Sequence, residues 1–221
     1  MIEVENMLFD LDGTLIDSRA DLARSINLML EEVGRSPLDE ELIASFVGDG
    51  VRVLVYRSLT ASHPEHHAPN EILHADGVAL MHKHYADQMF VSTRLYPGVE
   101  ETLKHFAGKR RAVVTSKETR FVELILERFG IAAEFDCIIG GDTVPERKPN
   151  PLPVIEAIRR LGGQASDTVM IGDSENDINA GRRAETRTCA ACYGFRTADQ
   201  MRKTNPDAMI ESIDQLAKFF S

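Results

Sequence analysis

The sequence has no tryptophan and only three cysteines among its 221 residues. Three thiols cannot form a disulfide framework, so we expect a fold held together without disulfides. Cys189 and Cys192 have the spacing of a redox motif, but they lie in a segment with the pattern of a buried strand. Residues three apart on a strand face opposite sides of the sheet, which argues against a redox pair or a metal site there.

The chain also lacks long apolar runs and an excess of positive charge. No apolar run approaches the ~20 residues that are needed to span a bilayer. Acidic residues outnumber basic ones by 35 to 25, and the net charge is -10. Nucleic acids and anionic membranes require a positive surface, so we expect neither as a partner. Glu3 and Glu5 flank the first apolar residues, unlike in a signal peptide, which predicts a cytoplasmic location.

Short apolar runs alternate with helical patterns from residue 96 onward, and this alternation is typical of βαβ units. We therefore predict an α/β fold with a Rossmann-like core of parallel strands. The helical patterns include 119–129 and 151–161, and each stops at a glycine. The expected strands are 112–114, 137–139, 168–171, 189–192 and 208–210.

Residues 18 to 90 contain no clear strand and read as a helical insertion. We predict a core domain made of residues 1–17 and 91–221, and a helical cap domain made of residues 18–90. Six of the seven histidines fall in the insertion, but no cysteine lies near them, so a solvated helical surface is favoured over a zinc site. These histidines are His63, His66, His67, His74, His82 and His84.

The segment Asp10-Leu11-Asp12-Gly13-Thr14 follows the apolar run 7–9, which reads as a buried strand. Side chains alternate along an extended chain, so Asp10 and Asp12 are expected to point the same way. Two carboxylates in one small space repel each other unless a cation intervenes. The pattern suits a nucleophilic carboxylate, a second acid for proton transfer and a divalent metal, although Asp-Gly is also a common turn.

Two further segments are expected just beyond the carboxyl ends of strands, where open parallel sheets bind ligands. Thr115 and Ser116 follow the strand at 112–114, and we expect them at a helix entrance, where hydroxyl and N–H groups bind phosphate oxygens. Lys148 precedes a proline, so its ammonium is held on a stiff segment and supplies a cation for a phosphoryl group. A simple helix cap and an exposed turn lysine are the alternatives.

The third segment, 172–177, follows the clearest strand. Ser174 and Asp177 resemble a helix capping box, but capping does not require Asp173. We expect Asp173 at the strand tip beside Asp10. Hard oxygen ligands of this kind fit Mg²⁺.

All four segments, in this order, resemble the motifs of the haloacid dehalogenase superfamily, and specifically of its Mg²⁺-dependent phosphatases with a helical cap. The resemblance covers essentially the whole chain and implies hydrolysis of a small phosphorylated metabolite. It makes Asp10 the nucleophile and Asp12 the acid and base. It implies that the phosphoryl group is bound by Asp10, Thr115, Ser116 and Lys148. It also implies that Mg²⁺ is bound by Asp10, the Asp12 carbonyl and Asp173, and that Asp177 lies next to these ligands without binding the ion directly.

Within this superfamily, the opening residues and the segment 47–54 look like the branch that hydrolyses 2-phosphoglycolate. A carboxylate-bearing substrate needs a positive partner or backbone N–H groups, and the cap residues Gly48, Asp49, Gly50 and Arg52 are candidates for that role. A solvated position is the alternative for Arg52. The chain departs from the branch at Ser116, where asparagine is usual, and at Glu185, where glycine is usual.

Other activities share part of this pattern. A phosphomutase, a sugar phosphatase or a pyrophosphatase has the same core motifs and differs in the cap. A receiver-like phospho-accepting module also uses a parallel sheet and clustered acids, but it needs no cap. A dehalogenase does not retain an acid like Asp12. Nothing in the sequence indicates an oligomeric state.

Overall fold

The structure is a computed structural model that describes all residues, 1–221, and it divides into two compact units. The first unit comprises Met1–Asp17 and Leu95–Ser221, and the second comprises Ser18–Arg94. The units are described separately. No helix of either one is long and apolar enough to cross a membrane.

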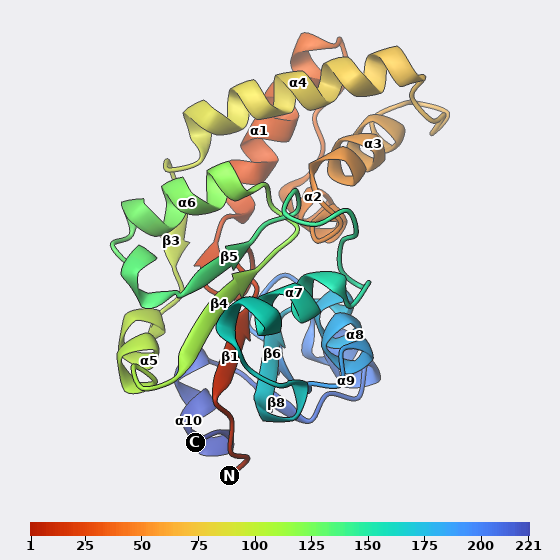
Figure 1. The fold of residues 1–221 in the computed structure, drawn as a ribbon. Coiled ribbons are helices and arrows are strands. Elements are labelled where there is room, and N and C mark those ends of the chain that lie inside the picture. The colour runs from red at the N-terminus through yellow and green to blue at the C-terminus, as the bar shows by residue number, and fades with distance from the viewer. The chain divides into compact units, whose positions relative to one another are not determined.

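A six-stranded parallel sheet in the order β5-β4-β1-β6-β7-β8 forms the centre of the first unit (Figure 1). The predicted α/β fold with a parallel sheet is confirmed. In register, Phe9 of β1 lies opposite Val113 of β4 and Ile171 of β6. The strands are β1 (Asn6–Phe9), β4 (Arg110–Val114), β5 (Cys137–Ile139), β6 (Thr168–Gly172), β7 (Arg187–Ala191) and β8 (Ala208–Ile210).

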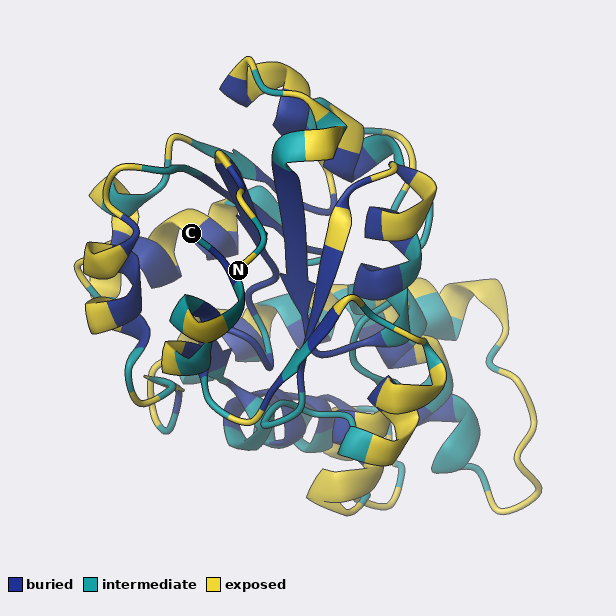
Figure 2. Cartoon of the chain, turned by 90° about the horizontal axis from the view of Figure 1, so that it is seen from below, coloured by how far each residue is buried: buried dark blue, intermediate teal, exposed yellow.

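Helices cover this sheet, and its central strands are fully buried, as Figure 2 shows. The strands at the centre read as continuous apolar runs because helices pack against the sheet. The helix α7 contacts β1, β4 and β5, and α8 contacts β6 and β7. The helices are α5 (Val99–His105), α6 (Thr119–Arg128), α7 (Leu152–Leu161), α8 (Glu175–Arg183), α9 (Ala198–Lys203) and α10 (Leu216–Phe219), with the short 3₁₀ turns η1 (Ala132–Glu134), η2 (Ala165–Asp167) and η3 (Ile213–Gln215).

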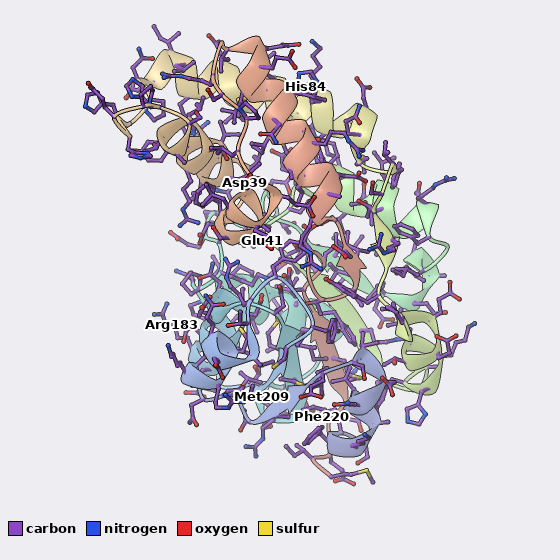
Figure 3. All side chains as sticks on the ribbon, turned by 180° about the vertical axis from the view of Figure 1, so that it is seen from behind. Asp39, Glu41, His84, Arg183, Met209 and Phe220 are labelled. Atoms are coloured by element: carbon purple, nitrogen blue, oxygen red, sulfur yellow. The ribbon has the colours of Figure 1, made fainter.

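The second unit contains four helices that pack around a core of their own. Helix α1 contacts α2, α3 and α4, and α3 also contacts α4. A Cβ on Gly77 of α4 would lie 3.0 Å from a methyl group of Val55, so α3 and α4 approach closely at this glycine. The helices are α1 (Arg19–Glu32), α2 (Glu40–Phe46), α3 (Val51–Ala61) and α4 (Glu71–Gln88). Figure 3 labels Asp39, Glu41 and His84 among the side chains of this unit.

The second unit ends at Arg94, later than the helical insertion expected to end at residue 90. Asp21 in the first turn of α1 is fully buried and explains this end point. Its carboxylate accepts hydrogen bonds from the N–H of Ser92 at 2.9 Å, and from the N–H and hydroxyl of Thr93 at 2.8 Å. Residues beyond α4 therefore remain attached to α1. The short strands β2 (Ile16–Asp17) and β3 (Arg94–Leu95) form a separate two-stranded sheet.

Neither the three cysteines, which lie in the first unit, nor the histidines of the second unit form a group of side chains able to hold a metal ion. All three cysteines are free thiols, and Cys189 is buried. His63 stacks on His67 with ring centroids 5.1 Å apart, and neither belongs to a group of side chains able to hold a metal ion.

Candidate active site

Polar side chains follow the carboxyl ends of three adjacent strands in the first unit. Asp10 comes directly after β1, Thr115 after β4 and Asp173 after β6. The backbone continues to bond at these points: the Asp10 N–H donates to the Ile171 carbonyl, and the Thr115 N–H donates to the Ile139 carbonyl, both at 2.9 Å. The sheet order thus brings together residues that are far apart in the sequence.

Lys148 is the central cation of this group, and it is almost completely buried. Its Nζ donates to Asp10 Oδ1 at 2.9 Å, to Asp177 Oδ1 at 2.5 Å and to the Val114 carbonyl at 2.7 Å. Three oxygens from three elements match the three protons of an ammonium group. Lys148 therefore joins the ends of β1 and β4 to helix α8.

The loop that carries Lys148 is fixed from both sides. Arg183 at the end of α8, labelled in Figure 3, donates to the Pro149 carbonyl at 2.8 Å. Arg147 donates from Nε to the Gly141 carbonyl at 3.0 Å. The peptide bond between Lys148 and Pro149 is cis. Two guanidinium groups thus hold the backbone on either side of the buried ammonium.

Asp177 has two tasks, one at each oxygen. Its Oδ2 accepts from the N–H of Ser174 at 3.0 Å and from the Ser174 hydroxyl at 2.6 Å, which forms the expected capping box at the start of α8. Its Oδ1 accepts from Lys148. A Cβ on Gly172 would lie 2.2 Å from the Asp177 carboxyl carbon, so only glycine leaves room for this carboxylate.

Asp173 lies in a cradle formed by two glycines. A Cβ on Gly13 would lie 2.1 Å from Asp173 Oδ2, and a Cβ on Gly194 would lie 2.5 Å from the same atom. The Phe195 N–H donates to this oxygen at 2.6 Å. Gly13 has a φ of 84°, which other residues rarely adopt, so glycine is required there for both conformation and space.

The electrostatics of the group depend on burial and on repulsion between carboxylates. Burial, and to a lesser degree Asp177, raises the pKa of Asp10 to about 6, although Lys148 acts in the opposite direction. Burial and the charges of Asp10 and Asp177 raise the pKa of Asp173 well above its usual value. Burial opposes the charge of Lys148, but Asp10 and Asp177 raise its pKa above the usual value, so it remains an ammonium.

Asp10, Asp173 and Asp177 each place a carboxylate oxygen within 4.8 Å of the others, a spacing that can hold a metal ion. Burial raises the pKa of both Asp10 and Asp173, so the ionised forms of these two neighbouring carboxylates are unfavourable without added positive charge. A hard divalent cation between oxygen ligands would supply that charge, so the residues fit Mg²⁺. The proposed contribution of the Asp12 carbonyl stays a prediction.

Asp12 pairs with a different lysine. Lys117 Nζ donates to Asp12 Oδ1 at 2.9 Å, and the two side chains are only 8% and 10% exposed. Sequence reasoning assigned no role to Lys117. Its position two residues after Thr115, beyond the end of a central strand, is the signal that could have identified it.

The second predicted segment lies just before a helix, as expected. Helix α6 begins at Thr119, so Thr115 and Ser116 lie on a loop before the helix and not in its first turn. Ser116 Oγ is buried and has no hydrogen-bond partner, and the same is true of Thr14 Oγ1. A hydroxyl without a partner at this edge of the sheet can donate to a phosphate oxygen.

The cap candidates Gly48, Asp49, Gly50 and Arg52 all belong to the second unit, where Gly50 precedes α3. Asp49 accepts from the Arg57 guanidinium at 2.6 Å. The Arg52 side chain is exposed on α3, as in the alternative interpretation of this residue. Their roles toward a substrate stay predictions.

Two further contacts escaped the sequence analysis, and both come from the segment after β7. The Phe195 N–H holds Asp173, and the Tyr193 hydroxyl donates to the Thr14 carbonyl at 2.9 Å. Their location beyond the end of a sheet strand was the only indication available in the sequence.

Comparisons with known proteins agree with this arrangement. Curated phosphoglycolate phosphatases of Vibrio parahaemolyticus and Neisseria meningitidis are 37% and 38% identical to the chain, covering 97% and 96% of it and 95% and 92% of their own lengths. The crystal structure of a predicted phosphoglycolate phosphatase from Haemophilus somnus superimposes with a TM-score of 0.92 at 32% identity, covering 97% of each chain. The model of the haloacid dehalogenase-like hydrolases matches residues 7–191, which include every core motif described above. With most of its length matched in this way, the chain belongs to the haloacid dehalogenase-like hydrolase family.

Proposed function

We propose that this phosphatase hydrolyses a small phosphate monoester, 2-phosphoglycolate, with Mg²⁺ and through a phosphorylated Asp10. The observation that carries the proposal is the buried ammonium of Lys148, bonded to Asp10 and Asp177 beside the further carboxylate of Asp173. Buried charges of this kind are costly to fold and are typical of functional sites.

Asp10 is the proposed nucleophile. A carboxylate attacks phosphorus only when it is ionised, and burial opposes ionisation by raising the pKa of Asp10 to about 6. Lys148 lies 2.9 Å from its Oδ1 and favours the ionised form. A bound Mg²⁺ ion would add a second positive charge and polarise the phosphoryl oxygens.

Asp12 is the proposed proton donor and acceptor. In the first half-reaction, the bond between phosphorus and the ester oxygen breaks as the bond from Asp10 to phosphorus forms, and Asp12 gives its proton to the departing oxygen. In the second, Asp12 takes a proton from the water that attacks phosphorus, and Asp10 is released with inorganic phosphate. One carboxylate serves both steps.

The phosphoryl group itself is assigned to Thr115, Ser116 and Lys148. The Ser116 hydroxyl has no partner within the protein, and the loop that carries it is fixed because the Gly141 N–H donates to the Lys117 carbonyl at 2.7 Å. A fixed donor aimed at developing negative charge is the usual means of stabilising a transition state.

The substrate is proposed from the relatives. Curated proteins 37% and 38% identical to this chain, over nearly its whole length, are phosphoglycolate phosphatases. The proposal extends their substrate to this chain and includes the cap residues Gly48, Asp49, Gly50 and Arg52 as contributors to selectivity. A small phosphorylated metabolite is thus the proposed partner, and the cytoplasmic location stays a prediction.

Phosphate release from a panel of esters, with Mg²⁺ and with a chelator, tests the proposal. We expect 2-phosphoglycolate to be among the best substrates and the chelator to abolish turnover. Asp10→Asn should remain folded and lose nearly all turnover, whereas Asp199→Asn, an exposed substitution on α9, should not. Full activity of Asp10→Asn would contradict the mechanism, and strong activity on sugar phosphates with none on 2-phosphoglycolate would contradict the substrate.

A further inference from the structure

The main chain of Lys117 is held on both sides. Its N–H donates to the Thr115 hydroxyl at 3.3 Å, and its carbonyl accepts from Gly141 at 2.7 Å. A Cβ on Gly141 would lie 2.2 Å from the Ser116 carbonyl oxygen, so the two loops touch without a side chain between them. The Lys117 side chain therefore starts from a fixed point.

The ammonium of Lys117 lies on the Asp12 side of the carboxylate group. Its Nζ is 2.9 Å from Asp12 Oδ1, whereas Lys148 bonds to Asp10 and Asp177. The two lysines thus contact different parts of the site. In the proposed reaction Asp10 faces phosphorus and Asp12 faces the ester oxygen, so Lys117 belongs to the leaving-group side.

The charge of this region favours a second function for Lys117. Asp10, Asp12, Asp173 and Asp177 belong to this region, and a substrate that bears both a phosphate and a carboxylate adds further negative charge to it. An ammonium can bond two anions at once, as Lys148 does with Asp10 and Asp177. A neutral donor would be enough if the only task were to hold Asp12.

The dimensions of a two-carbon substrate suit this arrangement. In a phosphate ester of glycolate, the carboxylate carbon is two bonds from the ester oxygen, so the carboxylate oxygens lie within about 4 Å of it. A general acid acts on the ester oxygen at about 2.6–3.2 Å. An ammonium at hydrogen-bond distance from Asp12 is then within reach of that carboxylate.

We propose that Lys117 determines substrate specificity by binding a carboxylate carried on the carbon next to the ester oxygen. This inference rests on the proposed function and deepens it, because it assigns recognition of the substrate carboxylate to a residue of the first unit. In the second unit, the Arg52 side chain is exposed and Arg57 pairs with Asp49 at 2.6 Å.

The test compares 2-phosphoglycolate with 2-hydroxyethyl phosphate, which has the same size and an uncharged CH₂OH group in place of the carboxylate. We expect Lys117→Met to lower the ratio of the two kcat/KM values by about tenfold or more, mainly through KM for 2-phosphoglycolate. Both rates can fall because Lys117 also contacts Asp12, so the ratio is the readout. Lys109→Met is the matched control: it removes the same charge at the opposite end of β4, where Lys109 pairs with Glu5, and should leave the ratio unchanged.

Two further variants keep the inference testable if the methionine variant does not fold. Lys117→Arg retains the charge and should keep most of the wild-type ratio, whereas Lys117→Gln should lose it. If the wild-type protein hydrolyses 2-phosphoglycolate but Lys117→Gln lowers kcat/KM equally for both substrates, this inference is overturned and the proposed function is not. A wild-type protein that hydrolyses neither ester, or only the uncharged one, overturns the proposed function as well.

Discussion

Replacing Asp10 with asparagine should stabilise the metal-free protein at neutral pH. The folded protein raises the pKa of this buried carboxyl from 3.8 to about 6, chiefly through burial. The folded state therefore binds the proton more tightly than the unfolded state does, and stability falls as the pH rises from 3.8 through 6. A shift of roughly two pKa units is worth about 3 kcal/mol, because each unit contributes about 1.4 kcal/mol. Asparagine has the shape of the protonated acid and avoids this cost.

The assay is unfolding of wild type and Asp10→Asn in a chelator at pH 5 and pH 8. The advantage of the variant should be about 3 kcal/mol at pH 8 and about half of that at pH 5, since part of Asp10 is still protonated there. For a chain of this size, the difference at pH 8 corresponds to an increase in Tm of about 6–12 °C. Excess Mg²⁺ should narrow the gap, because the ion binds the ionised carboxylate of the wild type only.

Asp142→Asn provides a control of opposite sign. Burial opposes the charge of Asp142, but hydrogen bonds from Thr119 lower its pKa below the usual value. Its ionised form therefore stabilises the fold above the unfolded pKa, and its replacement should destabilise at pH 8. An Asp10→Asn protein that is no more stable than wild type at pH 8 in the chelator would refute the reasoning.

The remaining predictions concern three other carboxylates. Asp12→Ala should slow hydrolysis of an alkyl phosphate by about 10²- to 10⁴-fold. The first step should slow less for a nitrophenyl ester, because its leaving group needs no proton. A loss of less than tenfold in steady-state kinetics would mean that another residue transfers the proton. Asp21→Asn should destabilise the second unit by about 3 kcal/mol in urea unfolding, because the NH₂ group of the new amide would face the N–H donors of Ser92 and Thr93. A change in the free energy of unfolding below about 1 kcal/mol would contradict this account. Glu185→Gly should raise stability by about 1 kcal/mol, because Glu185 has a φ of 62°, and a lower Tm would show that its side chain matters more than this strain.

Local patterns were sufficient to predict the positions of the main strands in the sequence and their arrangement in a parallel sheet, but not the order of the strands within it. Each strand of the first unit is a short apolar run between helical patterns, because strands covered by helices are apolar throughout. The resemblance, not a local pattern, singled out Glu185 as a departure from the usual glycine; its φ of 62° is the left-handed conformation in which glycine commonly ends a helix. Asp10 and Asp173 were expected at neighbouring strand ends, and the structure places them there.

Contacts between distant segments could not be predicted in the same way. The pairing of Lys117 with Asp12, the bond from Phe195 to Asp173 and the bond from Arg183 to Pro149 each join residues that no periodicity relates. The late end of the second unit has the same origin, because Asp21 reaches the backbone of Thr93 far along the chain. Such contacts depend on the final geometry and leave no trace in local composition.

The position of β1 in the middle of the sheet has a consequence for synthesis on the ribosome. In register, Asn6 lies opposite Arg110 and Thr168, so this apolar strand leaves the ribosome long before either neighbour exists. The helices of 18–94, in contrast, form one contiguous unit that is complete before β4 is made. Because domains fold as units during translation, the inserted segment can fold before its host, while β1 remains unpaired and exposed to aggregation or chaperone binding. The proposed catalytic residues therefore come together late, when the end of β6 brings Asp173 beside an Asp10 made far earlier.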